Sequence, residues 1–388
     1  AQGIFSLRSA HLGWGLDFIA QNLESPTTVL HYPSEKEFRK ELSLGYDFVG
    51  ISFVMATWYK AKRLIEIVRT LSPMTKVVLG GYGTVLGEVD AYADYVCRGE
   101  GAAFMRHLLG ETRDRPYEAA RFVTQTKTVS LSTGKSGILL AGIGCPNGCE
   151  FCCTSHFFQK QHIPLLKTGR EIYEAMRDYD TCLPSRSYGI IDEDFLKDKR
   201  RIEELYDYTT AELDKPRVFS CFASAKSIRQ YDPAWLAELG VDSVWIGVES
   251  QHCGYEKTKN IDLKELFDSL HQVGINTLAS TIIGVDQHTP ENIWADVQYH
   301  LSLNPTLSQF LIFSPCPRTP LWDRLDAQGV LEKDYPLDKR DGFHVLFDHP
   351  HFSAAQLERC QREAFDAEYV ELGPSVLRYL EKVLWGYR

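Results

Sequence analysis

The expected fold follows from residues 142–158, which read Gly-Ile-Gly-Cys-Pro-Asn-Gly-Cys-Glu-Phe-Cys-Cys-Thr-Ser-His-Phe-Phe. Cys145, Cys149 and Cys152 are separated by three and then by two residues on a loop that contains glycine and proline. Three thiolates on such a loop can bind three irons of a 4Fe–4S cluster, which usually has four cysteine ligands. The fourth iron is then open to an outside ligand, so the loop predicts a cluster that performs chemistry.

Other roles for these cysteines are less compatible with the sequence. A structural zinc site needs four ligands, and no second CxxC or HxxxH pair completes such a set. A disulfide framework is not expected in a large chain with no sign of secretion. Cysteines buried for packing alone do not require the glycines, the proline and the aromatic residue of this loop. Cys153 is a fourth thiol beside the motif and is interpreted as a spectator.

The pattern CxxxCx(aromatic)C, with Phe151 as its aromatic residue, resembles the signature of the radical S-adenosylmethionine superfamily. The resemblance implies that the open iron binds the amino and carboxylate groups of S-adenosylmethionine, near Phe151. Reductive cleavage then releases a 5′-deoxyadenosyl radical. An external electron donor, such as a flavodoxin or a ferredoxin, is implied as a partner.

Composition limits the remaining possibilities. The chain has 388 residues, 44% apolar and 24% charged, which suits two or three globular domains. Its net charge of −10 gives no reason to expect binding to nucleic acid or to an anionic membrane. No run of eighteen apolar residues predicts a membrane span, and the ten cysteines suit a reducing compartment. We therefore expect a soluble, cytoplasmic protein.

Residues 1–110 alternate strand and helix patterns, which predicts a doubly wound parallel sheet of the flavodoxin or Rossmann kind. The residues 46–54 form a near-continuous apolar run, as in a strand covered on both faces. Ser34 and Glu37 form a capping box that predicts a helix start. The predicted strands cover 3–7, 27–32, 46–54, 76–81 and 94–97, and the predicted helices cover 13–23 and 58–71.

This first domain resembles the cobalamin-binding domain of one branch of the superfamily. Ser52 stands where that domain has an S-x-L motif, and Gly80-Gly81 follows at nearly the family interval. A serine at a strand end can bond the nucleotide tail of cobalamin, and glycines let the tail pass close to the backbone. His11 lies in the loop of the family's D-x-H-x-x-G motif, but the aspartate is missing. His11 is therefore expected to contact cobalamin without binding cobalt.

Two further residues are assigned to cobalamin. The segment 55–59, with Trp58 and Tyr59, is expected to cover the lower face of the cobalt. The alternative is that both rings only begin a helix and pack on the sheet. A flavodoxin-like domain without any cofactor is the other alternative for residues 1–110.

The second half of the chain predicts an open (β/α)6 partial TIM barrel over residues 136–325, after a polar connector at 111–135. Ligands of such barrels bind at the carboxyl ends of the strands, and the cysteine loop follows the first strand. Residues 326–388 are expected to be a small helical region, which resembles the helical appendage that closes the barrel mouth in cobalamin-dependent members of the superfamily. The six predicted strands cover 136–143, 188–191, 218–223, 243–248, 276–283 and 308–313.

Polar residues at these strand ends are assigned to S-adenosylmethionine. The resemblance places Asp192 or Glu193 at its amino group, which a carboxylate can bind. It places Glu249 at the ribose hydroxyls and Ser224 at a less specific contact. Each could instead cap a helix or face solvent. Cys316, between two prolines, is interpreted as structural.

The resemblance as a whole implies a cobalamin-dependent methyltransferase, in which methylcobalamin methylates an unactivated carbon of a small-molecule or natural-product substrate after hydrogen abstraction. A first alternative is a non-methylating reaction on the same architecture, such as ring contraction, cyclisation or oxidation. A second alternative is an iron–sulfur protein for electron transfer or binding. Neither the substrate nor the oligomeric state follows from the sequence.

Overall fold

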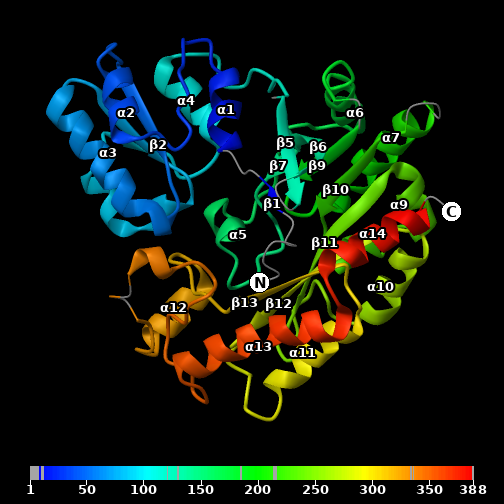
Figure 1. Ribbon diagram of the computed structural model, residues 1–388. Helices are drawn as coiled ribbons and strands as arrows, with labels where there is room; N and C mark the ends of the chain where they lie inside the picture. Colours follow the sequence, from blue (N-terminus) through cyan, green and yellow to red (C-terminus); the bar gives the residue numbers. More distant parts are fainter. Residues whose placement is uncertain are drawn as a thin grey trace.

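The computed structural model describes residues 8–9, 13–119, 121–128, 131–183, 186–212, 216–332, 334 and 336–386. The chain forms an α/β protein with a small parallel sheet near the amino terminus and a large, mostly parallel sheet after it (Figure 1). The cysteine loop and its short helix α5 (Cys153–Phe157) lie between the two sheets (Figure 1). Among the described residues, no helix is both long and apolar enough to cross a membrane.

The small sheet contains β2 (Phe48–Ser52), β3 (Lys76–Gly80) and β4 (Tyr95–Val96), all parallel and in this order. Its core is built from apolar side chains of these strands and of the helix that joins β2 to β3. The helices of this unit are α1 (Trp14–Gln21), α2 (Glu35–Leu42), α3 (Trp58–Leu71) and α4 (Gly101–Leu109). The 3₁₀ turns are η2 (Met55–Thr57), η3 (Tyr82–Val85) and η4 (Gly87–Ala91).

Several local predictions for this unit are confirmed. Ser34 and Glu37 form the predicted capping box at the start of α2, with the Glu37 amide donating to the Ser34 hydroxyl. Helix α3 has the predicted bounds, and β2, β3 and β4 lie inside the predicted strands. The segment 27–32 is not a strand, which corrects the prediction. Pro26 and Pro33 flank this segment, and proline donates no ladder hydrogen bond. The predicted strand 3–7 lies outside the described residues.

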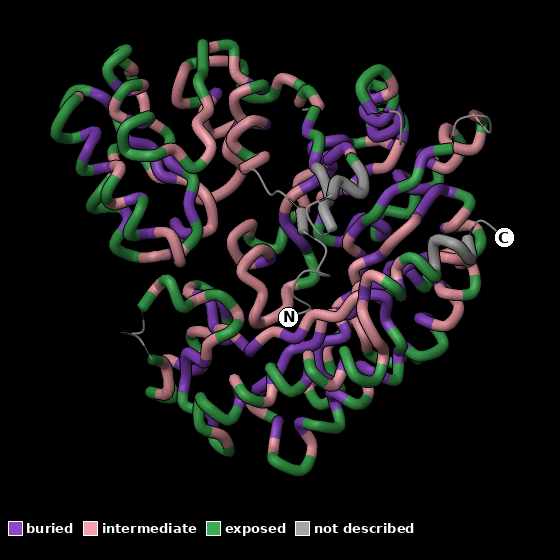
Figure 2. Tube along the Cα trace, viewed as in Figure 1, coloured by how far each residue is buried: buried purple, intermediate pink, exposed green. Residues whose placement is uncertain are grey.

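The large sheet contains six consecutive parallel strands, from β6 to β13, joined by helices. Buried side chains follow these strands, whereas the outer faces of the helices are exposed (Figure 2). In spatial order the strands are β1 (Arg8–Ser9), β5 (Phe122–Thr128), β6 (Leu131–Leu140), β9 (Ser187–Ile191), β10 (Val218–Phe222), β11 (Val241–Glu249), β12 (Asn276–Ile283) and β13 (Leu307–Ile312). The connecting elements are α6 (Gly169–Arg177), η5 (Phe195–Lys197), α7 (Lys199–Thr210), α8 (Ala225–Ile228), α9 (Pro233–Leu239), α10 (Leu263–Gln272) and α11 (Ile293–Ser302).

The expected polar connector at 111–135 contains a strand. Strand β5 pairs antiparallel with β6, and β1 pairs antiparallel with β5, so this part of the chain widens the large sheet. Phe122 and Thr124 are buried whereas Val123 is exposed, which is the alternation of a half-buried strand. The polar composition of the region concealed this alternation.

The carboxyl-terminal region packs on the far edge of the large sheet. Its elements are α12 (Pro320–Ala327), η6 (Leu337–Lys339), α13 (Ala354–Leu372) and α14 (Ser375–Gly386). Helix α13 lies along β12 and β13, and the Gln361 side chain donates to the Phe310 carbonyl at 2.7 Å. A second cluster of buried apolar residues joins these strands to α11, α12 and α13.

Candidate functional site

The cysteine loop is held at the carboxyl end of β6 by its own hydrogen bonds. A two-stranded ribbon of β7 (Gly142–Ile143) and β8 (Ile163–Pro164) frames it. The Ser155 hydroxyl donates to the Cys145 carbonyl at 2.7 Å and accepts from the Gly148 amide at 3.0 Å. Gly144 has a φ of 77°, and a Cβ there would clash with the Gln161 carbonyl, so this turn requires glycine.

The three cysteine side chains suit a cluster. Cys145 is buried, whereas Cys149 and Cys152 are partly exposed toward the site. Burial raises the pKa of all three thiols, that of Cys152 to about 11. Amide N–H groups oppose this by donating to sulfur, from Asn147 to Cys145 and from Ser155 to Cys152. Such N–H···S bonds stabilise thiolates and tune clusters bound to them.

No three His, Cys, Asp or Glu side chains among the described residues converge as ligands of a single metal ion would. That geometry differs from cluster binding, in which each thiolate ligates a different iron and the sulfurs stay apart.

Asp192, one of the two carboxylates predicted at the amino group of S-adenosylmethionine, follows β9 and is already bonded by neighbouring side chains. Its carboxylate is buried and accepts from Arg201 at 2.7 Å and from His162 at 3.0 Å. Burial alone would raise the Asp192 pKa, but His162 and Arg201 lower it below its usual value. Asp192 therefore joins β9 to α7 and to the loop after the cysteines.

Glu193 is the better placed of the two carboxylates. It is exposed, and no described residue is a hydrogen-bond or ion-pair partner of its side chain. Loss of water around the carboxyl group and the charge of Asp192 raise the Glu193 pKa. The Glu193 charge in turn raises the pKa of Cys152 and of Tyr82. Glu193 therefore lies near enough to Cys152 and Tyr82 for its charge to act on both, and an ammonium group beside it would relieve its unfavourable surroundings.

Asp194 and Ser224 connect the cysteine loop to β10. Asp194 accepts from the Ser224 hydroxyl at 3.0 Å, from the Ser224 amide at 2.9 Å and from the Asn147 side chain at 3.1 Å. Ser224 also caps α8. Ser224 thus has a structural role in this arrangement, and the sequence reasoning missed the role of Asp194.

Glu249 lies at the end of β11, beside the cysteine loop. A bulge between Gly247 and Glu249 interrupts the register with β12, and Glu249 has a φ of 63°. Its buried carboxylate forms an ion pair with Lys257, whose ammonium lies 5.7 Å from the centre of the Phe151 ring. Phe151 also packs edge-on against Tyr255 at 5.3 Å. A left-handed non-glycine residue at a bulge is typical of a functional site.

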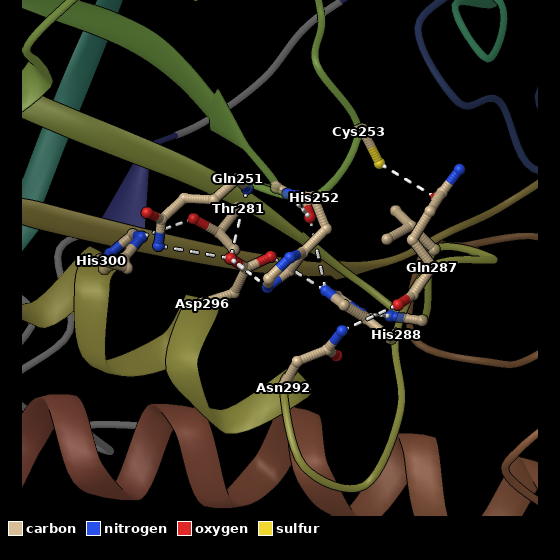
Figure 3. A network of polar contacts seen from close by, with 12 residues as sticks. Gln251, His252, Cys253, Thr281, Gln287, His288, Asn292, Asp296 and His300 are labelled. Atoms are coloured by element: carbon tan, nitrogen blue, oxygen red, sulfur yellow. Dashed lines mark hydrogen bonds and ion pairs between the residues drawn. The ribbon is translucent and has the colours of Figure 1, made fainter.

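A buried polar network fixes the loop that follows Glu249 (Figure 3). His288 is buried, accepts from the Gly284 amide at 3.0 Å and donates to Asp296 at 2.9 Å. Asp296 also accepts from the Gln251 amide at 3.2 Å, and His252 lies 3.6 Å from it. These contacts anchor the chain two residues beyond Glu249, so they hold the left-handed turn in place.

The residues assigned to cobalamin lie on the small sheet in different settings. Ser52 is exposed at the end of β2, and Gly81, with a φ of 85°, lies against it. A Cβ on Gly81 would lie 2.6 Å from the Phe53 carbonyl, so a bare backbone is required here, whereas at Gly80 there is room. Gly81 is thus required for the close approach of its loop to the Ser52–Phe53 backbone. His11 lies outside the described residues.

Trp58 and Tyr59 differ in their surroundings, because Trp58 is buried and Tyr59 is exposed. The Trp58 ring is 1% exposed, stacks on Phe53 at 5.0 Å and donates to Glu88. The packing alternative is therefore the one that describes Trp58. Tyr59 is exposed and borders a pocket with Lys62, Leu337 and Asp338.

The small sheet and the cysteine loop meet at an aromatic cluster. Tyr82, directly after Gly80-Gly81, packs against Phe157 at 5.0 Å and edge-on against Phe158 at 6.2 Å. Burial and the nearby Glu193 charge raise the Tyr82 pKa, and Thr154 bonds its hydroxyl. Aromatic rings thus cover one side of the cysteine loop. Cys153 is hydrogen-bonded to Cys316 on its other side, as a thiol pair.

Lys257, Asp194 and Tyr82 were not identified from the sequence. Lys257 follows Glu249 by eight residues in a loop without a recognisable motif, and no local pattern predicts that the two side chains pair. Asp194 stands next to the two acids that were noticed, and only its position on the loop could have indicated a role.

None of the known protein-family models matches the chain. It is 23% identical over 380 residues to an uncharacterized methyltransferase of Pyrococcus horikoshii, covering 85% of this chain and 80% of that protein. It is 26% identical over 237 residues to the hopanoid C-2 methylase of Rhodopseudomonas palustris, covering 58% and 44%. It is 21% identical over 344 residues to the anaerobic magnesium-protoporphyrin IX monomethyl ester cyclase of Rubrivivax gelatinosus, covering 75% and 61%. The match thus spans less than two thirds of the latter two proteins.

A solved structure shares the fold. It is the radical S-adenosylmethionine methyltransferase TsrM from Kitasatospora setae, with cobalamin and a [4Fe–4S] cluster bound. The TM-score is 0.67 at 16% identity, covering 82% of this chain and 75% of that one. Over most of its length the chain therefore shares the fold of this solved methyltransferase.

Proposed function

We propose that the protein is a cobalamin-dependent radical S-adenosylmethionine methyltransferase that methylates an unactivated carbon of a small molecule. Residues 1–110 would form the Rossmann-like cobalamin domain, 111–135 the connector, 136–325 the (β/α)6 partial barrel and 326–388 its helical cover. The main support is that the Gly80-Gly81 loop adjoins the helix of the cysteine loop through Tyr82, Phe157 and Phe158. Cobalamin on that loop would therefore lie beside the cluster.

In this proposal the site residues bind three different groups, according to where they lie. Cys145, Cys149 and Cys152 would hold the cluster, Glu193 would accept the ammonium of S-adenosylmethionine, and Glu249 would approach its ribose. Ser52 and Gly81 would hold the cobalamin tail. When bound, the cluster would supply a 5′-deoxyadenosyl radical and cobalamin would supply the methyl group. An external one-electron donor such as a flavodoxin or a ferredoxin is part of this proposal.

The aromatic cluster supports the same reaction. Tyr82, Phe157 and Phe158 cover one side of the cysteine loop and would limit the entry of water. Excluding water keeps a reactive carbon radical for its intended C–H bond.

Anaerobic purification with added iron, sulfide and cobalamin tests the proposal. Bound cobalamin is expected in the absorption spectrum, and labelled S-adenosylmethionine should give 5′-deoxyadenosine and a product that carries one additional methyl group. A product without a methyl group would favour a second candidate, a radical cyclisation, which the similarity to the Rubrivivax cyclase supports. Absence of 5′-deoxyadenosine would contradict both.

A further inference from the structure

The ion pair of Glu249 and Lys257 lies beside the cysteine loop, at the aromatic residue between Cys149 and Cys152. Lys257 extends over the Phe151 ring at 5.7 Å, and Phe151 immediately precedes Cys152 in the loop. The side chains of Lys257 and Glu249 are 19% and 7% exposed, so water screens their charges poorly. Gly247 makes room for the pair, because a Cβ there would lie 2.9 Å from the Lys257 ammonium.

The two charges of the pair are opposite in sign and lie on the same side of the cysteine loop, at Phe151. Despite burial, the charge of Glu249 raises the Lys257 pKa, which keeps the ammonium charged. Lys257 is thus a permanent cation between a carboxylate and the cysteine loop.

We propose that Glu249 and Lys257 are positioning residues that set the reduction potential of the cluster from the Phe151 side of the cysteine loop. The inference rests on the proposed function, because it requires a cluster on Cys145, Cys149 and Cys152. Reduction adds one electron from a low-potential donor and makes the cluster one unit more negative, with no bond formed or broken. A nearby cation stabilises that reduced form and a nearby anion destabilises it.

The pair also links the potential to ligand binding. The Glu249 carboxylate accepts a hydrogen bond from Lys257. A ligand that draws Glu249 toward its hydroxyl groups would leave the Lys257 charge less compensated beside the cysteine loop. The cluster would then be easier to reduce once the ligand is in place.

Substitutions of opposite sign test the inference. Lys257→Met removes the cation and is expected to reduce the ratio of reduced to oxidised cluster about tenfold at a fixed potential, which is 59 mV for one electron. Glu249→Gln removes the anion and is expected to change this ratio in the opposite direction. Lys257→Arg keeps the charge and should stay near the wild-type ratio. The measurement is a redox titration followed by electron paramagnetic resonance, without substrate.

The same loop offers a matched control. Lys259 and Glu256 form an exposed ion pair at 2.8 Å, so Lys259→Met and Glu256→Gln remove similar charges in solvent. These variants should leave the potential unchanged. Unspecific damage would shift the reduction potential of Lys257→Met and of Glu249→Gln in the same direction, and that result would overturn the inference. An unchanged potential in both variants would overturn it as well. Failure of the wild-type protein to hold any cluster would contradict the proposed function as well.

Discussion

At the scale of single residues, the carboxylates at the site differ in whether other side chains of the protein already pair with them. Asp192 and Asp194 are buried and bonded by neighbouring side chains. Glu193 is exposed and, among the described residues, has no partner. An ammonium forms a charge-assisted hydrogen bond most favourably with a carboxylate that no protein group already pairs, so a ligand ammonium gains most from the acid that lacks a partner. The assignment of S-adenosylmethionine contacts therefore depends on unpaired charge more than on nearness to a strand end.

The cluster cysteines give the first prediction at this scale. Cys149→Ala removes one of three thiolates, so the reconstituted protein should lose most of its iron–sulfur absorbance. The production of 5′-deoxyadenosine should fall to background, because a radical requires an intact cluster. Cys182, an exposed cysteine away from the loop, provides the control Cys182→Ala, which should keep both signals. Cleavage that survives in Cys149→Ala would refute the ligand assignment.

His300 gives a prediction about pH. Burial, together with the charge of Arg378, lowers its pKa to about 3, against 6.5 for an ordinary histidine. Between these values the unfolded chain binds a proton that the folded protein does not bind, so stability falls as pH falls through this window. The slope should approach about 1.4 kcal/mol per pH unit. Urea unfolding from about pH 7 to 4 should show a shallower slope for His300→Gln than for wild type. An identical slope in both would contradict this.

At the scale of elements, the helix starts were predictable from local sequence signals, whereas the pairing of strands in the sheets was not. The capping box at Ser34 begins a helix as predicted, and the capping box at Thr168 and the proline after Asp232 also begin helices, because each signal is complete within four residues. The strand predicted at 27–32 was wrong and β5 was missed, because membership of a sheet depends on partners far along the chain. The same limit applies to the site, where Cys149 was predictable and its neighbour Lys257 was not.

The ion pair that joins β9 to α7 gives a prediction at this scale. Asp192→Asn leaves the buried Arg201 guanidinium without a counter-charge and should destabilise the protein by about 3–5 kcal/mol in denaturant unfolding. The exposed pair of Arg170 and Glu174 on α6 is the control, and Glu174→Gln should change stability by less than about 1 kcal/mol. If Asp192→Asn were as stable as Glu174→Gln and bound S-adenosylmethionine less well, Asp192 would be a ligand contact after all.

At the scale of the whole molecule, the reaction requires two sheets to be held at a fixed distance. Helix α5 lies between them in Figure 1, and Tyr82 is the residue of the small sheet that packs on its aromatic end. At the lower edge of the small sheet, η6 borders the pocket at Tyr59, so the carboxyl-terminal region also contacts this unit. The two cofactors of the proposal would each be bound by a different unit. Placement of the units should therefore affect methyl transfer separately from radical formation.

The last prediction tests this separation with Tyr82→Ala. Removing the ring eliminates two aromatic contacts, each worth about 0.5–1.5 kcal/mol, between the small sheet and α5. The cysteines, Glu193 and Glu249 are untouched, so 5′-deoxyadenosine should still form at a rate close to wild type. Methylated product should fall several-fold, because proximity between the reacting groups is lost. Tyr32→Ala, which removes an 80% exposed ring from the same unit, should change neither product. Measuring 5′-deoxyadenosine and methylated product in one reaction gives their ratio directly. An equal loss of both products would mean that Tyr82 acts on the cluster itself. An unchanged ratio at full activity would mean that this contact does not place the two units.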